Sequence, residues 1–499
     1  MSLVPNTSNG KSQKRLIERY FAQKGLPLDR AVAFPDVYII DRTSRIGRRS
    51  DIKDFDVHLT KEVALHIPIV SSNMMDVTES RMAIMMARAG GLGFIHQFLP
   101  IKKRVHEVEK VKRADNEIVE NPWSVDEDMR LIDALQFAQE KGTSGVLVVD
   151  KKGRLAGILT SRDVRFATQR FGERLENIKV KDLMTPMPLV VGPKNIRIKE
   201  AMRLLDEHKI EKLPLVDRVL RPVGLVTAKD VLKRSEHPFA SRDRKGQLIV
   251  GATVGISGNF FDEAAALIRA KADVILIDTA RGNSIRARDA VRAIHKKFPK
   301  TPLVAGNVDS AEGTALLVAA GATGIKVGIG PGSACKTRVT TGIGTPQLTA
   351  IAECAAVAHA RGIPVIADGG IKNGGDFAKA IVAGADCVML GSMLAGTEET
   401  PGEVYYDSGE RYKLYRGSAG LDSQLARLDH GGLDGVRAPE GVTRKILFKG
   451  ESASETIEAL LQNLRSSMSY TNSRTIKEFH AATFRLQTNA GYEEGKPKD

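Results

Sequence analysis

The chain has 499 residues, of which 42% are hydrophobic and 27% charged, a globular balance long enough for two or more domains. No segment approaches the ~18 uncharged apolar residues of a membrane helix, and residues 1–15 contain no apolar signal core, so we expect no membrane association and a cytoplasmic location. The net charge of +14 suits an anionic partner. The basic residues are dispersed and aromatic residues make up only 5%, which favours an anionic small molecule over nucleic acid.

Residues 1–30 are polar and basic, with one predicted helix over Gln13–Phe21. From residue 67 onward, short apolar runs, mostly continuous in Val, Ile and Leu, alternate with helical patterns, as is typical of parallel strands covered on both faces. Eight strands separated by helices predict an α/β fold, a (β/α)8 or TIM barrel, rather than an open doubly wound sheet. The predicted strands are Ile67–Met74, Gly90–His96, Leu248–Gly255, Asp273–Thr279, Pro302–Val308, Gly324–Gly330, Pro364–Gly370 and Asp386–Ser392.

The alternation breaks between the second and third strands, from about residue 116 to residue 244, where the sequence contains an internal repeat. Residues 145–164 recur as residues 212–231, and each copy has the order helix, strand, turn, strand, helix. Two such copies can bury their apolar faces against each other, which predicts one small inserted domain. The expected domains are therefore 1–116 and 237–499 for the barrel and 117–236 for the insertion.

The repeat resembles a tandem CBS (Bateman) domain. This resemblance implies allosteric binding of purine nucleotide effectors, with contacts from two threonines and from the aspartates three residues after them, Thr160, Asp163, Thr227 and Asp230. A purely structural pair that only mediates contacts between subunits remains the alternative.

Polar residues gather at the expected carboxyl ends of the barrel strands, where the active site of such a barrel lies. One aspartate at a strand end could simply cap a helix, but capping does not explain six polar clusters. They are Ser71–Met74, Asp278–Asn283, Gly306–Asn307, the loop Gly328–Arg338, Asp368–Gly370 and Gly391–Ser392.

The loop Gly328–Arg338 combines three glycines, the hydroxyl of Ser333 and Cys335. Glycines let backbone amides approach a phosphate closely, and the charges of Lys336 and Arg338 would favour a thiolate. The loop therefore predicts covalent chemistry on a nucleotide, against the alternative of a packing loop with an inert thiol. The other two cysteines, Cys354 and Cys387, lie in apolar runs and are expected in the core, and no Cys/His spacing is typical of zinc.

After the eighth strand, residues 415–445 read as a mobile flap that contains Gly431, Gly432 and Gly435 and ends near Pro439–Gly441. Residues 454–466 are predicted to be helical.

The stretch Val327–Gln347, the turn Asp368–Gly370 and the segment Gly391–Gly396 resemble the IMP dehydrogenase/GMP reductase family. The resemblance covers about residues 30–116 and 245–485. It implies a purine mononucleotide substrate (GMP or IMP), a nicotinamide cofactor and a homotetramer that can pair into octamers.

The resemblance also implies a role for each matching position. Cys335 attacks C2 of the purine, Asp368 binds the ribose hydroxyls, and Ser72 and Met74 line the base. The substrate's phosphate is expected at Ser333, Gly370, Gly391, Ser392 and Tyr415, and Gly417 is also expected to bind substrate. The cofactor is expected near Asp278 and Asn307, and a K+ ion at the carbonyls of Gly328, Gly330 and Cys335.

The two activities in the family differ in one half-reaction. A dehydrogenase hydrolyses the covalent adduct, and in the family an Arg-Tyr pair in the flap activates the water. This flap has Arg427-Leu428, and the nearby pair Arg411-Tyr412 lies outside it. A reductase passes protons to the departing amino group through a threonine and a glutamate, here Thr337 and Glu440.

The sequence therefore favours an NADPH-dependent GMP reductase, which converts GMP to IMP, ammonia and NADP+. IMP dehydrogenase, which converts IMP, NAD+ and water to XMP and NADH, is the alternative, and Met82–Phe98 and Gly391–Glu403 resemble that enzyme. A non-catalytic nucleotide sensor is disfavoured by the intact Cys335, Thr337 and Asp368. Lys336 replaces the usual small residue of the signature for no evident reason.

Overall fold

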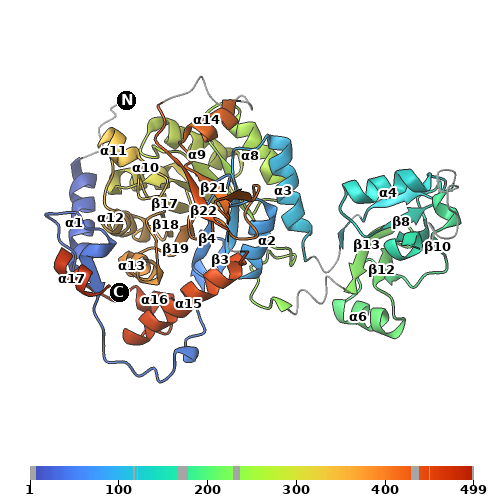
Figure 1. Ribbon diagram of the computed structural model, residues 1–499, viewed down its shortest axis with the longest axis horizontal. Coiled ribbons are helices and arrows are strands. Elements are labelled where there is room, and N and C mark those ends of the chain that lie inside the picture. The colour runs from blue at the N-terminus through green and yellow to red at the C-terminus, as the bar shows by residue number, and fades with distance from the viewer. Residues whose placement is uncertain are drawn as a thin grey trace. The chain divides into compact units, whose positions relative to one another are not determined.

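The computed structural model describes residues 7–115, 119–120, 122–165, 178–228, 236–428, 438–448 and 450–496 (Figure 1). The chain forms two compact units, one from Met1–Lys112 with Phe239–Asp499 and one from Arg113–Pro238. In the described part of the chain, no helix is both long and apolar enough to cross a membrane.

The larger unit is built on a closed barrel of eight parallel strands, in the order β14-β15-β16-β17-β18-β19-β4-β5. The predicted (β/α)8 barrel is confirmed, and each strand lies inside its predicted range. The strands are β4 (Ile69–Ser71), β5 (Leu92–Ile95), β14 (Gly251–Val254), β15 (Val274–Asp278), β16 (Leu303–Val308), β17 (Gly324–Val327), β18 (Val365–Asp368) and β19 (Cys387–Leu390). They are shorter than predicted because the polar ends of the runs belong to loops.

Helices cover the outside of the barrel. Successive side chains of each strand point alternately to these helices and to the barrel interior, and because both faces are buried, the strands are continuous apolar runs. The helices in chain order are α2 (Ser80–Arg88), α3 (Ile101–Arg113), α8 (Phe260–Arg269), α9 (Ile285–Lys297), α10 (Ala311–Ala320), α12 (Gln347–His359), α13 (Gly374–Ala383) and α15 (Ala453–Tyr470). The short helix α11 (Thr337–Thr341) follows the loop after β17 and has no buried residue. The predicted helix over residues 454–466 is part of α15.

The two terminal segments of the chain meet on the barrel. Helix α1 (Thr7–Lys24), longer than the predicted helix, packs against α12. Strand β1 (Val37–Ile39) pairs antiparallel with β23 (Phe484–Leu486). Smaller elements complete this region: η1 (Phe34–Asp36), η2 (Arg49–Asp51), β2 (Val57–His58), β3 (Ala64–Leu65), α16 (Ile476–Phe479) and α17 (Asn489–Glu494).

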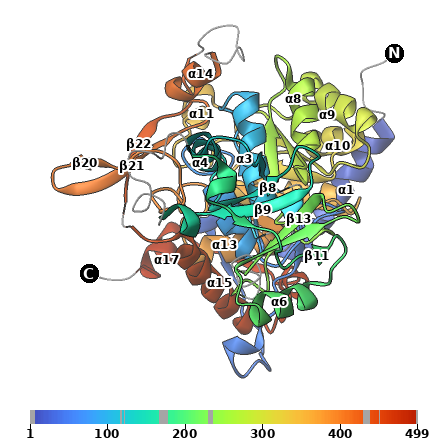
Figure 2. The ribbon, with the colours of Figure 1, turned by 90° about the vertical axis from the view of Figure 1, so that its right-hand side faces the viewer.

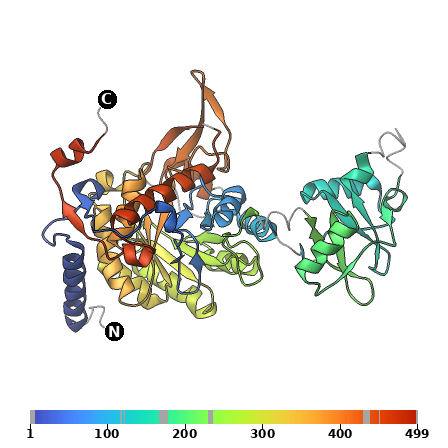
Figure 3. The same ribbon diagram turned by 90° about the horizontal axis from the view of Figure 1, so that it is seen from below.

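A three-stranded antiparallel sheet, β20-β21-β22, follows the last barrel strand. Its strands are β20 (Tyr405–Asp407), β21 (Glu410–Arg416) and β22 (Thr443–Leu447), and α14 (Leu421–Leu428) lies between the last two in sequence. The β20–β21 hairpin projects from the barrel in both Figure 2 and Figure 3. Residues 429–437 of the predicted flap, including Gly431, Gly432 and Gly435, lie outside the described residues.

The smaller unit contains two four-stranded sheets, β10-β9-β8-β7 and β11-β12-β13-β6. The internal repeat has the same register in both, because Gly145 pairs with Thr160 on β8–β9 and Lys212 pairs with Thr227 on β12–β13. Buried side chains that include Leu147 and Leu225 join the two sheets. The elements are β6 (Val119–Glu120), β7 (Ser124–Asp126), α4 (Leu131–Glu140), β8 (Gly145–Val149), β9 (Leu155–Thr160), η4 (Val180–Asp182), β10 (Thr185–Pro186), β11 (Gly192–Pro193), α6 (Ile198–Glu207), β12 (Lys212–Val216) and β13 (Pro222–Thr227).

Candidate active site

The thiol of Cys335 lies half-buried at the end of the loop that joins β17 to α11. Its Sγ donates a hydrogen bond to Thr337 Oγ1 at 3.2 Å, and the Thr337 hydroxyl donates to Glu440 Oε2 at 2.7 Å. The three predicted catalytic residues therefore form one continuous hydrogen-bonded chain. Such a chain can carry a proton between a carboxyl group and a group held at the thiol.

Backbone contacts fix Glu440 against this loop independently of its side chain. The Lys336 N–H donates to the Glu440 carbonyl at 2.7 Å, and the Val442 N–H donates to the Ala334 carbonyl at 3.0 Å. Gly417 packs so closely on the same loop that an added Cβ would lie 2.5 Å from the Ala334 carbonyl oxygen. A side chain at this position would separate the two segments, which gives Gly417 a packing role beside its predicted contact with substrate.

The charged neighbours of Cys335 are arranged differently from each other. Lys336 is exposed. Arg338 turns back into its own loop, where its guanidinium donates to the carbonyls of Ile329, at 2.8 Å, and Thr345. Arg338 therefore links the start of the loop to Thr345, which follows α11, and its hydrogen bonds go to these carbonyls rather than to the thiol.

The predicted substrate-binding residues from three other strand ends lie close together. The Tyr415 hydroxyl donates to Met74 Sδ at 3.2 Å, and a Cβ added to Gly391 would lie 2.6 Å from that hydroxyl oxygen and 3.6 Å from Ser72 Cβ. Burial, and after it the charge of Asp368, raise the pKa of Tyr415 well above its ordinary value, while Ser333 hydrogen-bonds to it. Tyr415 therefore remains a neutral hydroxyl beside the thiol loop, suited to an anionic group.

Ser392 is half-buried beside Gly391. Gly370 has a φ of +84°, and a Cβ added there would lie 3.4 Å from Pro331 Cβ of the thiol loop. Gly370 therefore lies against the thiol loop, and the role of Ser392 stays a prediction.

A buried lysine joins the two predicted binding carboxylates. Lys326 Nζ lies 2.6 Å from Asp368 Oδ2 and 2.9 Å from Asp278 Oδ1. Burial alone would lower the pKa of Lys326, but the charges of Asp278 and Asp368 outweigh it and raise the pKa above its ordinary value. The site thus contains one cation between two carboxylates, and Asp368 accepts a further bond from Asn307 Nδ2 at 2.9 Å.

The predicted cofactor residues have features that fit a polar ligand. Asn307 Oδ1 is buried and has no hydrogen-bond partner among the described residues, so it can accept a bond from a bound molecule. Asp278 Oδ2 accepts from Gln97 Nε2 at 3.4 Å. An amide acceptor and a carboxylate at adjacent strand ends suit the carboxamide and ribose hydroxyls of a nicotinamide nucleotide.

Two carbonyls at or beside the predicted K+ site already accept hydrogen bonds. The Gly328 carbonyl already accepts from Asn307 Nδ2 at 2.7 Å, and the Ile329 carbonyl beside Gly330 accepts from the Arg338 cation. The K+ ion remains a prediction from the resemblance.

The other two cysteines are inert by position. Cys354 on α12 and Cys387 on β19 are fully buried, and burial raises the pKa of both thiols well above the ordinary value. The expectation that both fill the core is confirmed.

In the smaller unit, Asp163 Oδ2 accepts from the Thr160 N–H at 2.7 Å and from its hydroxyl at 2.6 Å, and Asp163 Oδ1 accepts from Thr185. Thr227 occupies the register position equivalent to Thr160, and Asp230 lies outside the described residues. Effector binding at these residues remains a prediction.

Several residues of the site were missed from the sequence. Lys326 had a signal, because a lysine inside a continuous apolar strand needs buried partners. Gln347, whose Nε2 donates to the carbonyls of Val327 and Asp368, lay at the end of the signature stretch. Arg416, which forms a bidentate pair with the buried Asp76, had no local signal because its partner is 340 residues away.

Comparison with known proteins places this geometry in context. A family model described as "IMP dehydrogenase / GMP reductase domain" matches residues 31–498. Inosine-5'-monophosphate dehydrogenase from Aquifex aeolicus is 44% identical over 94% of this chain and 95% of its own length, and that from Nitrosopumilus maritimus is 41% identical over 94% and 98%. The crystal structure of a GMP reductase from Trypanosoma brucei in complex with guanosine 5'-monophosphate matches with a TM-score of 0.88 and 36% identity, covering 94% of this chain and 98% of that one.

Proposed function

This chain belongs to the IMP dehydrogenase/GMP reductase family, and on that premise we propose that it is an NADPH-dependent GMP reductase acting on purine mononucleotides. The proposal rests on the sequence of the flap, which lacks the Arg-Tyr pair that a dehydrogenase of this family uses. The structure adds the hydrogen-bonded chain from Cys335 through Thr337 to Glu440. It connects a nucleophile to a proton donor, and a departing amino group needs such a donor.

In the proposed reaction, Cys335 Sγ bonds to C2 of GMP, and the bond between C2 and the 2-amino group breaks. Glu440 supplies protons through the Thr337 hydroxyl, so that the amino group leaves as ammonia. A nicotinamide cofactor held near Asp278 and Asn307 would supply the hydride that C2 receives, and would itself be oxidised. The C2–S bond then breaks, the electron pair returns to sulfur, and IMP is released.

The rest of the site positions the nucleotide. Asp368, kept between Lys326 and Asn307, is directed at the ribose hydroxyls, and the hydroxyls of Ser333, Ser392 and Tyr415 with the glycine amides are directed at the phosphate. Preorganised donors of this kind lose little entropy when substrate binds.

IMP dehydrogenase is the second candidate, because the two curated relatives described above carry that name. It requires a base that activates water. The nearby Arg411-Tyr412 pair lies on β21, where the Tyr412 ring stacks on Tyr405 with centroids 5.6 Å apart and Arg411 lies over Phe448, so neither side chain is directed to the thiol loop.

One absorbance assay distinguishes a GMP reductase from an IMP dehydrogenase. Purified protein should consume NADPH with GMP and produce IMP and ammonia, and the Cys335→Ala variant should not. Production of XMP from IMP and NAD+, with no reaction of GMP and NADPH, would show a dehydrogenase instead. Mass spectrometry after incubation with nucleotide and cofactor should show a purine adduct on Cys335 in either case.

Assembly into tetramers or octamers and regulation by purine nucleotides at Arg113–Pro238 are part of the proposal. Light scattering tests the first. Activity of the full-length protein at fixed GMP and NADPH, followed while ATP or GTP is added, tests the second.

A further inference from the structure

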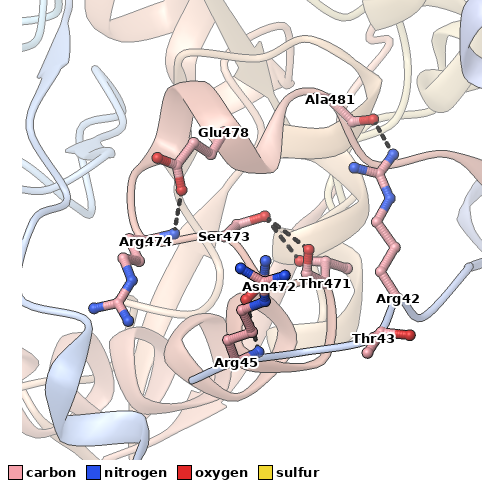
Figure 4. Close-up of a pocket in the computed structure, with 9 residues that line it drawn as sticks. All are labelled: Arg42, Thr43, Arg45, Thr471, Asn472, Ser473, Arg474, Glu478 and Ala481. Carbon is pink, nitrogen blue, oxygen red and sulfur yellow. Dashed lines mark hydrogen bonds between the residues drawn. The ribbon is translucent and has the colours of Figure 1, made fainter. Parts of the chain in front are cut away.

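A basic pocket lies on the larger unit, away from the residues described so far. We call it the basal pocket. Its volume is about 500 Å3, within the ~300–1,000 Å3 range of small-molecule sites. It is drawn in Figure 4 and is lined by Arg42, Thr43, Arg45, Thr471, Asn472, Ser473, Arg474, Glu478 and Ala481.

Two segments from opposite ends of the chain form the basal pocket, and backbone contacts fix them together. The Arg42 N–H donates to the Tyr470 carbonyl at 2.9 Å, and the Arg45 N–H donates to Asn472 Oδ1 at 2.9 Å. Thr471 and Ser473 are buried and hydrogen-bonded to each other. The floor of the pocket is therefore ordered, while the arginine side chains remain exposed.

The pocket is remote from Cys335. It follows β1 and the carboxyl end of α15, and Figure 1 shows α15 and α16 at the end of the barrel opposite α11 and α14. A ligand bound here does not share the predicted phosphate-binding residues of the thiol loop.

Three guanidinium groups give the pocket its charge. Arg42 donates to the Ala481 carbonyl, and Figure 4 shows Arg42 and Arg474 on opposite sides of the pocket. The guanidinium groups of Arg45 and Arg474 have no hydrogen-bond or ion-pair partner within the residues that the structure describes. Guanidinium groups pair with phosphate through two parallel hydrogen bonds, so this arrangement favours a phosphate group.

The remaining lining selects the rest of the ligand. Glu478 Oε2 accepts from the Arg474 N–H at 2.7 Å, and its second oxygen has no partner within the described residues. That oxygen would repel a bare anion but can accept from a hydroxyl group. The lining contains no aromatic ring and only one aliphatic side chain, Ala481, so it offers no surface on which a base could stack.

From these contacts we propose that the basal pocket binds a sugar phosphate, with the phosphate on Arg45 and Arg474 and a sugar hydroxyl on Glu478. The carboxylate gives the pocket its selectivity for a hydroxyl-bearing ester over inorganic phosphate. The site is separate from the nucleotide site of the proposed reaction.

The test is calorimetric titration of the full-length protein with ribose 5-phosphate and with inorganic phosphate, in saturating GMP and without cofactor. Ribose 5-phosphate should bind, and Arg474→Ala and Arg45→Ala should each weaken it at least tenfold. Arg49→Ala, an exposed arginine of the same segment outside the pocket, should leave binding unchanged.

Glu478→Gln gives a signature of opposite signs. It should weaken ribose 5-phosphate, because the amide accepts less strongly, and should tighten inorganic phosphate, because a repulsive charge is gone. If Glu478→Gln bound both ligands more tightly, the pocket would attract any anion through its positive charge alone, and the proposal would be overturned. Absence of ribose 5-phosphate binding in saturating GMP would overturn the proposal too. A change in oligomer mass in Arg45→Ala or Arg474→Ala would also overturn it, because it would assign the pocket to contacts between copies of this chain.

Discussion

Lys326 Nζ lies 2.6 Å from Asp368 Oδ2 on a lysine side chain that is 2% exposed. The same ammonium group contacts Asp278, so one buried cation balances the carboxylate predicted to bind substrate and the one predicted to bind cofactor. Removing it would leave two carboxylates near each other without a counter-charge, and such a change costs far more than the loss of a surface ion pair.

Lys326→Met should therefore destabilise the protein by about 3–5 kcal/mol, the range for a buried pair that loses one partner. It should also raise KM for both nucleotide and cofactor, because neither carboxylate keeps its position. Urea unfolding and steady-state kinetics measure the two effects.

Lys326→Arg preserves the charge and should recover part of the activity. The double variant Lys326→Met with Asp278→Asn should be more stable than Lys326→Met alone, since one uncompensated charge is removed. Equal stability of the single and double variants would mean that the carboxylates do not depend on Lys326.

The proton path from Glu440 to Thr337 gives a second prediction. Thr337→Val and Glu440→Gln should each lower kcat by ~10²–10⁴, the usual contribution of a positioned acid or base. The KM for GMP should change little, because the backbone bond from Lys336 to the Glu440 carbonyl remains. Thr337→Ser keeps the hydroxyl and should retain most of kcat, whereas a rise in KM at unchanged kcat would reduce both residues to a packing role.

The pair between Arg416 and Asp76 gives a third prediction. Asp76 is 3% exposed and accepts from the Arg416 backbone N–H at 2.7 Å and from Nε at 3.1 and 3.0 Å. Arg416→Ala leaves this carboxylate with only the backbone hydrogen bond among the described residues, so it should lower the free energy of unfolding by a few kcal/mol. It should also raise KM for GMP, because the preceding residue, Tyr415, is predicted to bind substrate.

Arg416→Lys tests the geometry of the pair. A lysine keeps the charge but not the planar fork, so it should recover only part of the loss. Full recovery would show that charge alone matters at this position. Thermal unfolding and KM measured on the same preparations separate the stability effect from the effect on binding.

These residues show where sequence reasoning succeeded. The barrel followed from local patterns, because a parallel strand covered on both faces has to be apolar along its length, as in Val365–Asp368. The thiol loop was also predictable from a local pattern, because its glycines, the Ser333 hydroxyl and Cys335 lie within a few residues of each other. Thr337 and Glu440 are 103 residues apart and were brought together only by the family resemblance.

Contacts between distant segments could not be predicted. No local pattern in Arg416 indicates that its partner is Asp76, and no pattern in Arg45 indicates that Arg474 borders the same pocket. Such pairs depend on how the barrel closes and on how the terminal segments meet. The terminal segments are joined by the long-range pairing of β1 with β23.

Lys24 gives the last prediction, which concerns pH. Its ammonium donates to the His480 carbonyl and is 5% exposed. Burial, and after it the charge of Arg42, lower the pKa of Lys24 from 10.5 to about 8. Between these two values the unfolded chain binds a proton that the folded chain has lost, so the free energy of unfolding should rise with pH across this window. The shift corresponds to about 3 kcal/mol, at ~1.4 kcal/mol per pH unit.

Lys24→Met lacks this group and should lack this rise. Urea unfolding of the wild type and of Lys24→Met should therefore show that, between about pH 7 and about pH 10.5, the wild type gains about 3 kcal/mol of stability relative to the variant. Lys14→Met, whose side chain is 80% exposed, is the matched control and should show a constant difference from the wild type. A constant difference for Lys24→Met as well would mean that Lys24 ionises in the folded protein as it does in the unfolded chain, and that α1 can open to let water reach it.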